Sequence, residues 1–288
     1  MGIPGSQLET WSHQGAIVTA KNTHESIRNA LDYLKWPDNV QYEAYLQGSY
    51  KNDTNIYGDM DVDVVVQLNS TFYSNLTEEQ KRALGLEPVP YGWAEFRRDV
   101  LSALQTYYGT QAVVEGNKCL KLTAGGGRLP ADVVVCAQYR WYQSVHVEDF
   151  VEGMAFWQHN SVQMTVNYPK IHYENGVKKH QDTEGRFKPV VRMFKNLRNF
   201  LILGDFIPGD LAPSYFVECA LYNVPNDSFS SSYQDTFCAA VNWLLGTDLT
   251  SLRFQNGQLG LCGDESVQWP VQKARQFLQQ LVSLWNSW

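Results

Sequence analysis

The first half of the chain mixes short runs of strand periodicity with two longer runs of helical periodicity. Apolar residues spaced by three or four positions predict helices over residues 17–34 and 92–108. Alternating and continuous apolar runs predict strands over residues 40–46, 61–68, 112–115, 118–123 and 132–139. This order of elements predicts an α+β fold in which helices flank a mixed sheet.

The second half of the chain has a different period. From about residue 155, apolar positions recur roughly every 3.6 residues, which is typical of helices. Helices are predicted over residues 188–198 and 267–288, and Pro213 is typical of a helix start. We therefore predict two domains, a core with an N-terminal helix over residues 1–155 and a helical lobe over residues 156–288.

Two aspartates, Asp61 and Asp63, stand two residues apart at the start of an apolar run. Because successive side chains of a strand point to opposite faces, both carboxylates project from the same face. Neighbouring carboxylates repel each other, so a divalent cation between them best explains the pair. Asp59 is an alternative partner for Asp61, but it follows Gly58 and is expected to lie in the preceding loop.

A Gly-Ser turn, Gly48-Ser49, is predicted just upstream of this strand. Glycine lets the backbone approach a ligand closely, and the serine hydroxyl and main-chain N–H groups suit a phosphate chain. Such a turn before paired carboxylates favours transfer of a nucleotide from a triphosphate.

A third carboxylate is expected on a neighbouring strand, because two metal ions in one site need a bridging ligand and a further anchor. Asp132 opens the last predicted strand of the sheet, after a turn of three glycines. An unpaired carboxylate there is costly to bury. Asp132 is therefore the candidate third ligand, and an exposed aspartate at a strand start is the alternative.

Together these motifs resemble a known family. The Gly-Ser turn, the Asp-Val-Asp strand and the Ala-Asp-Val-Val-Val-Cys strand resemble nucleotidyltransferases of the DNA polymerase beta type. The run that begins at Gln47 resembles one branch, the bacterial CD-NTases related to cyclic GMP-AMP synthase and oligoadenylate synthase. Segments around Asn167, Lys195 and Ser214 agree with that branch. The resemblance covers about residues 20–285.

The resemblance implies a bilobed enzyme that joins nucleoside triphosphates, such as ATP and GTP, into a cyclic dinucleotide or trinucleotide and releases pyrophosphate. It implies two Mg²⁺ ions held by Asp61, Asp63 and Asp132, with Mn²⁺ as a substitute. It also implies that the nucleotide is bound by Gln47, Gly48, Ser49, Lys195, Ser214 and Tyr215. The product would be a second messenger of CBASS antiphage defence, read by a separate effector protein. A regulatory protein partner is left open.

Composition narrows the choice of partners. The net charge of −7 argues against a broad surface for duplex DNA or RNA, because phosphate neutralisation dominates such binding. No apolar run approaches the roughly 20 residues of a membrane span, and the five cysteines lack Cys-x-x-Cys spacing. We expect a cytoplasmic protein, with a flexible start over residues 1–6, that needs neither duplex nucleic acid nor a membrane.

Three other functions remain open from the sequence. A linear synthase of the oligoadenylate type would share the fold but would not make a phosphatase-resistant product. A catalytically inactive nucleotide-binding partner would not be expected to retain all three carboxylates. A nucleotidyltransferase for a small acceptor, such as an antibiotic, would not turn over nucleotides alone.

Overall fold

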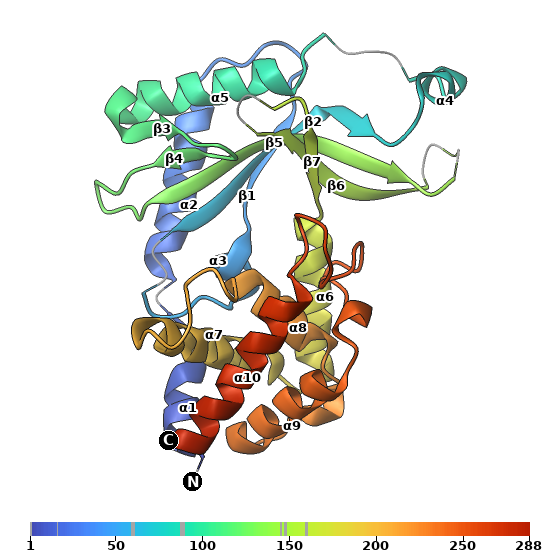
Figure 1. The fold of residues 1–288 in the computed structure, drawn as a ribbon. Coiled ribbons are helices and arrows are strands. Elements are labelled where there is room, and N and C mark those ends of the chain that lie inside the picture. The colour runs from blue at the N-terminus through green and yellow to red at the C-terminus, as the bar shows by residue number, and fades with distance from the viewer. Residues whose placement is uncertain are drawn as a thin grey trace. The chain divides into compact units, whose positions relative to one another are not determined.

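The computed structural model describes residues 2–15, 17–58, 61–86, 90–144, 146, 149–158 and 161–288. Its contacts divide the chain into two compact units, each discontinuous in sequence (Figure 1). The sheet unit consists of Ala16–Lys51 and Met60–Lys170. The helical unit consists of Met1–Gly15, Asn52–Asp59 and Ile171–Trp288.

The described part of the sheet unit contains seven strands. They are β1 (Tyr42–Leu46), β2 (Val62–Ser74), β3 (Val113–Glu115), β4 (Leu120–Leu122), β5 (Ala131–Tyr142), β6 (Phe150–Trp157) and β7 (Met164–Asn167). The order is β1-β2-β5-β4-β3, and β6 pairs with the later part of β5 and with β7. β2 and β5 are parallel and the other pairs are antiparallel, so the sheet is mixed, as predicted.

Two helices, α2 (Val18–Asp32) and α5 (Trp93–Tyr108), cover one face of this sheet (Figure 1). Their buried side chains, such as Ile27 and Phe96, form one core cluster with alternate residues of β2 and β5. The intervening residues of both strands pack in a second cluster with Met154 of β6. Strand alternation therefore separates a face under the helices from an opposite face. The short helix α4 (Glu78–Ala83) and 3₁₀ turn η1 (Thr110–Ala112) complete the connections.

Polar bonds fix β5 against its neighbours. Asn75, just after β2, donates from Nδ2 to the Tyr142 carbonyl (3.0 Å) and accepts at Oδ1 from the Tyr142 N–H (2.8 Å). Between the stretches that pair with β4 and with β6, the Val135 carbonyl accepts from the Trp93 indole N–H (2.8 Å). The β2–β5 register shifts between Leu68 and Phe72.

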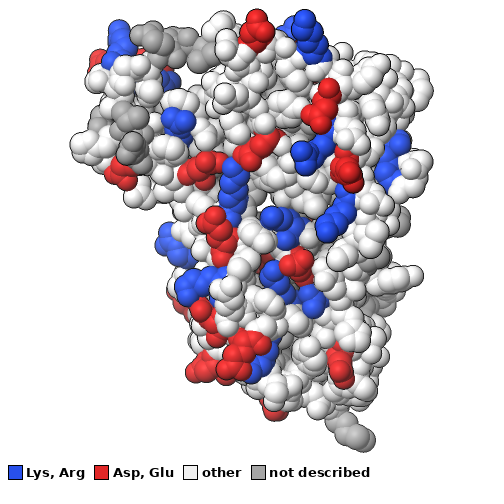
Figure 2. All heavy atoms as spheres, turned by 180° about the vertical axis from the view of Figure 1, so that it is seen from behind, with Lys and Arg blue, Asp and Glu red and all other residues white. Residues whose placement is uncertain are grey.

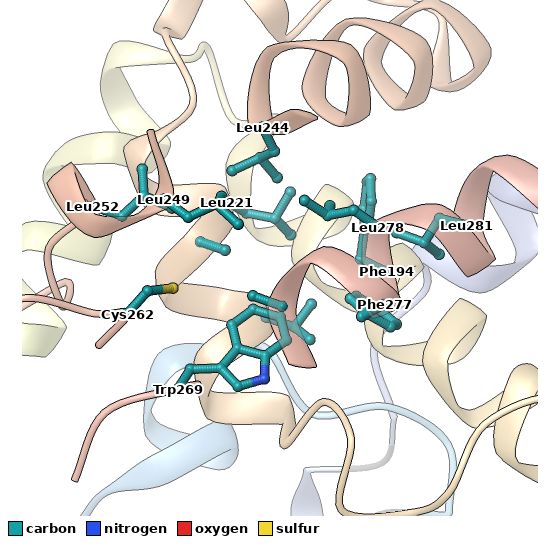
Figure 3. A pocket seen from close by; sticks show the side chains of 13 residues that line it. Phe194, Leu221, Leu244, Leu249, Leu252, Cys262, Trp269, Phe277, Leu278 and Leu281 are labelled. Carbon is teal, nitrogen blue, oxygen red and sulfur yellow. The ribbon is translucent and has the colours of Figure 1, made fainter. Parts of the chain in front are cut away.

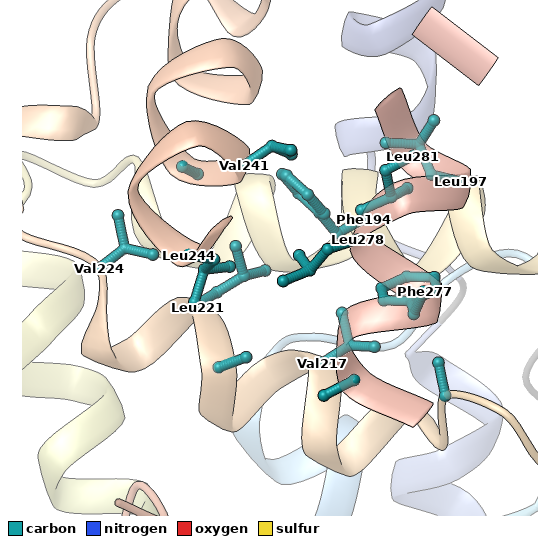
Figure 4. Packing of buried hydrophobic residues seen from close by; sticks show 14 of the residues in the cluster. Phe194, Leu197, Val217, Leu221, Val224, Val241, Leu244, Phe277, Leu278 and Leu281 are labelled. Carbon is teal, nitrogen blue, oxygen red and sulfur yellow. The ribbon is translucent and has the colours of Figure 1, made fainter. Parts of the chain in front are cut away.

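The helical unit is built around one apolar core. Its helices are α1 (Gly5–Ser12), α6 (Pro169–Asp182), α7 (Phe187–Leu203), α8 (Ser214–Asn223), α9 (Tyr233–Gly246) and α10 (Val271–Ser287), with 3₁₀ turns η2 (Asn226–Ser228) and η3 (Leu249–Ser251). Phe194, Leu221, Leu244 and Leu278 come from four different helices and point toward one another (Figure 4). An apolar pocket among the same residues is lined also by Trp269 (Figure 3). Its lining belongs to the core cluster, so we regard it as packed interior.

One of the expectations about the ends of elements is wrong. The described part of the expected flexible start, residues 2–6, is ordered: Ile3 is buried, its carbonyl accepts from Gln234 Nε2 (2.8 Å), and α1 begins at Gly5. The chain after residue 155 is mainly helical, as predicted, although β6 extends to Trp157 and β7 follows. Short apolar runs do not separate strand from helix by period alone. The predicted domain boundary at residue 155 stays a prediction; in the structure this position lies within β6.

Two further findings concern the environment of the protein. All five cysteines, each in the described part of the chain, are free thiols, as the spacing predicts. Across the described residues, no helix combines the length and apolar character that a membrane crossing demands.

Candidate active site

Asp63 and Asp132 occupy equivalent positions on neighbouring parallel strands. The register of β2 and β5 places them directly opposite each other. Val64 and Val133, the next residues on each strand, pack in the core under α2 and α5. By alternation, both carboxylates therefore project from the opposite face of the sheet. Asp61 is exposed and immediately precedes β2. Asp59, the alternative partner, lies outside the described residues.

The three carboxylates influence two side chains at the start of β4, Lys121 and Cys119. Lys121 donates from Nζ to Asp132 Oδ1 (3.2 Å), and this bond, with a weaker influence of Asp61, raises the pKa of the ammonium. Burial raises the pKa of the Cys119 thiol to about 11, and the charges of Asp132 and Asp63 add to the effect. All three predicted carboxylates therefore act on one small region at the start of β4.

The donor set suits a hard divalent cation. Asp61, Asp63 and Asp132 stand at the starts of the neighbouring strands β2 and β5 and offer carboxylate oxygens, which are the ligands that Mg²⁺ prefers. The structure does not show them closed around a centre: in the described ranges, no three His, Cys, Asp or Glu side chains are gathered for an ion. Asp132 is instead bound to Lys121. The residue types and their shared position at the strand starts fit the predicted metal site. That these three residues are the metal ligands stays a prediction.

The predicted Gly-Ser turn is in fact the start of a short helix, α3 (Gly48–Asn52). Gly48 has φ of +66°, and its backbone lies so close to Asp63 that an added Cβ would be 2.2 Å from Oδ2. The Gln47 N–H donates to the Asp63 main-chain carbonyl (3.0 Å). Ser49 lies in the first turn of α3. The sequence neighbours Gln47, Gly48 and Ser49 are therefore brought to the carboxylates, although their binding of nucleotide is untested.

We expect Gly48→Ala to lower the rate of nucleotide turnover by about 100-fold, because a displacement of reacting groups by about 1 Å costs that much. The added Cβ would push the Asp63 carboxylate away, since 2.2 Å is far inside van der Waals contact. Gly85→Ala is the matched control: φ is +67° and nothing lies within 4 Å of the new Cβ. Initial rates should fall for Gly48→Ala alone; equal losses would assign the effect to backbone strain.

The other predicted contacts lie in the helical unit. Lys195 on α7 is buried, and its Nζ donates to the Thr54 carbonyl (2.8 Å). Ser214 begins α8, and the ring of Tyr215 stacks on that of His172, with centroids 5.4 Å apart. Thus Lys195 helps to hold the chain segment after α3. The roles of Lys195, Ser214 and Tyr215 in nucleotide binding stay predictions.

A buried polar cluster, here called the Glu218 network, was not found from the sequence. Glu218 on α8 is only 5% exposed and accepts from Asn52 Nδ2 (3.2 Å) and Thr54 Oγ1 (3.0 Å). A third contact joins it to His172 Nε2 (3.1 Å). Burial opposes the charge on Glu218, but the bond to His172 and the charges of His172 and Lys195 hold the pKa of its carboxyl below its usual value.

The Glu218 network anchors Asn52 and Thr54 within the helical unit. Lys188 adds a further tie, donating from Nζ to Asp53 Oδ2 (2.8 Å). A signal was present in the sequence: Glu218 stands between Val217 and Cys219 in an apolar stretch, and a buried charge needs partners.

Comparison with known proteins gives a consistent result. Residues 174–286 match the family model described as the cGAS/DncV-like nucleotidyltransferase C-terminal helical domain. The chain is 54% identical to the cyclic UMP-AMP synthase of Rhodothermus marinus, over 100% of this chain and 99% of that protein. It is 35% identical to the cyclic nucleotide synthase CdnE01 of Staphylococcus haemolyticus, over 100% of both.

A solved structure extends the likeness to the fold. The structure of the Rhodothermus marinus CdnE c-UMP-AMP synthase with Apcpp and Upnpp superposes with a TM-score of 0.95, over 99% of this chain and 97% of that one. The predicted fold and family are therefore confirmed. With sequence identity of this order along the whole length, the chain belongs to the CD-NTase family and is a nucleotidyltransferase.

Proposed function

We propose that this enzyme joins two nucleoside triphosphates into a cyclic dinucleotide and releases pyrophosphate. The observation that carries the proposal is the pairing of Asp63 with Asp132 on parallel strands, with Asp61 two residues before and the Gly48 backbone alongside. The full-length relatives are named as cyclic nucleotide synthases, which supports the product class.

We propose UTP and ATP as the substrate pair. The relative with 54% identity is named a cyclic UMP-AMP synthase, and its structure holds Apcpp and Upnpp. The agreement over 99% of this chain supports carrying the preference over.

The chain's own groups have defined tasks in this chemistry. Asp61, Asp63 and Asp132 would hold Mg²⁺, or Mn²⁺ in its place. When bound, the metal neutralises the triphosphate and lowers the pKa of the attacking ribose hydroxyl. Strand register fixes the separation of Asp63 and Asp132, which sets where the acceptor and the triphosphate must meet. Gly48 has no side chain, so its main chain can lie directly against the Asp63 carboxylate.

We further propose that the product is a second messenger of antiphage defence, recognised by a separate effector protein. The support is the family itself and the product class of the named relatives. A regulatory protein partner is compatible with this role.

The proposal is tested by incubating the purified protein with four labelled nucleoside triphosphates and Mg²⁺ or Mn²⁺. We expect a phosphatase-resistant product whose mass is that of a cyclic dinucleotide, and its loss when UTP or ATP is omitted. A phosphatase-sensitive chain would indicate a linear synthase. Absence of any product would indicate an inactive nucleotide-binding partner.

Duplex nucleic acid is expected to leave this turnover unchanged. The net charge is −7, and basic and acidic side chains are interspersed on the face shown in Figure 2. Strong binding of a duplex requires a continuous basic surface whose side chains neutralise the phosphates. Strong stimulation that grows with duplex length and fades with added salt would contradict this part of the proposal.

A further inference from the structure

Lys121 is the basic side chain paired with the candidate metal ligand Asp132. The register of β4 and β5 places the two residues opposite each other. Leu120 and Leu122, on either side of Lys121, are buried in the core under α2 and α5. Alternation therefore directs Lys121 to the face that carries Asp132, and the Nζ–Oδ1 distance is 3.2 Å.

We propose that Lys121 is a positioning residue that holds Asp132 in the metal-free enzyme and competes with the cation for this carboxylate. The inference rests on the proposed function, because it assigns Asp132 to the metal. An ammonium beside the carboxylates offsets part of their mutual repulsion, as a metal ion would. It also occupies Oδ1 of Asp132, so a cation that uses this oxygen must displace it.

The properties of Lys121 suit a contact that is made and broken. Its side chain is 58% exposed, against 31% for Asp132, so the ammonium can move into solvent without disturbing the core. Lysine carries a compact charge on a flexible stem, whereas arginine would hold a carboxylate with two parallel bonds. The absence of a closed three-carboxylate group among the described residues agrees with Asp132 being held at β4.

The two ions of the proposed site should therefore differ in affinity. An ion held by Asp61 and Asp63 competes with Lys121 less than one that also needs Asp132, because the ammonium is bonded to Asp132 and only weakly influenced by Asp61. Lys121 would weaken the second ion selectively and so raise the metal concentration at which the site is complete.

The test is a titration of the nucleotide-free protein with Mn²⁺. Binding is measured by calorimetry and by electron paramagnetic resonance. Lys121→Met keeps most of the unbranched side chain and removes its charge. We expect the Asp132-dependent ion to bind about two- to fivefold more tightly, the size expected for a partly exposed ion pair. Lys121→Gln should behave in the same way, and Lys121→Arg should not gain affinity. Lys118→Met, at an exposed position before the same strand, is the matched control and should match wild type.

A second set of variants links the gain to Asp132. In an Asp132→Asn background, Lys121→Met should give no increase in Mn²⁺ affinity, because the contested carboxylate is gone. Unchanged or weaker Mn²⁺ binding by both Lys121→Met and Lys121→Gln would overturn the inference, as would an equal gain in the Asp132→Asn background. Failure of the wild type to make a cyclic product would instead reject the proposed function, and metal binding would still report on Lys121.

Discussion

Replacing both Asp61 and Asp63 by asparagine is expected to reduce synthesis of the cyclic product by about 1,000-fold or more. Metal ions contribute several kcal/mol of charge stabilisation to such transition states, and each 1.36 kcal/mol corresponds to a factor of ten in rate. Asparagine has nearly the same shape as aspartate but removes the negative charge that holds the metal. Initial rates with labelled nucleotides measure the loss.

The fold should survive this double substitution. Removal of two neighbouring charges relieves repulsion, so the thermal midpoint without metal should hold or rise. Asp38 and Asp264 are exposed, and their replacement by asparagine gives a control with the same change in net charge. A normal rate for the Asp61 and Asp63 variant would refute the catalytic assignment.

Loss of Glu218 is expected to have the largest effect on stability. Glu218→Ala would leave the Asn52 amide, the Thr54 hydroxyl and His172 without their buried acceptor. Breaking a buried, hydrogen-bonded charge network costs about 3–5 kcal/mol. The free energy of unfolding from urea denaturation should fall by this amount, and amide hydrogen exchange should increase in residues 52–59. Unchanged exchange in this segment would show that other contacts hold it.

The pH dependence of stability gives an independent check on Glu218. Its pKa in the folded protein is below the usual value, so the carboxylate stabilises the fold above the unfolded-state pKa of about 4.3. That contribution disappears as the pH falls through the lowered pKa. The stability difference between wild type and Glu218→Gln should therefore shrink below about pH 4. If the stability difference instead grew in acid, the pKa of Glu218 in the folded protein would have to be raised rather than lowered.

The carboxylates could be predicted because their placement follows from local rules. Strand alternation places Asp63, and the apolar run after Asp132 marks its strand, whereas Asp61 lies just before β2. Lys121 could not be assigned in this way, since its partner is set by the register of a three-residue strand, β4. The Gly48-Ser49 pair predicts a turn because glycine is common in turns, whereas in the structure Gly48, with a positive φ, is the first residue of the helix α3.

The Glu218 network shows why long-range polar contacts escape such rules. Glu218 lies 166 residues from Asn52 and 164 from Thr54 in sequence, so no local spacing connects them. The helix that carries Lys195 has a clear apolar stripe, and Lys195 lies outside it. Basic side chains in such positions are usually exposed to solvent, so the sequence does not predict that Lys195 is buried. Burial of Lys195 instead depends on the Thr54 carbonyl, a main-chain group that carries no side-chain signature in the sequence.

The pairing of β2 with β5 has a consequence for how this enzyme can fail. Val64, Val65 and Val66 face Val133, Val134 and Val135, so neighbouring alignments would bury nearly equivalent side chains. A slip by one residue would nevertheless turn Asp132 to the wrong face. The hydrogen bonds of Asn75 with Tyr142 form only in the correct alignment and so help to select it. They lie at the other end of β5, roughly 33 Å from Asp132 at 3.3 Å per residue. A misaligned chain would therefore lose stability as well as activity, because Asp132 would enter the core under α2 and α5 without a partner for its charge.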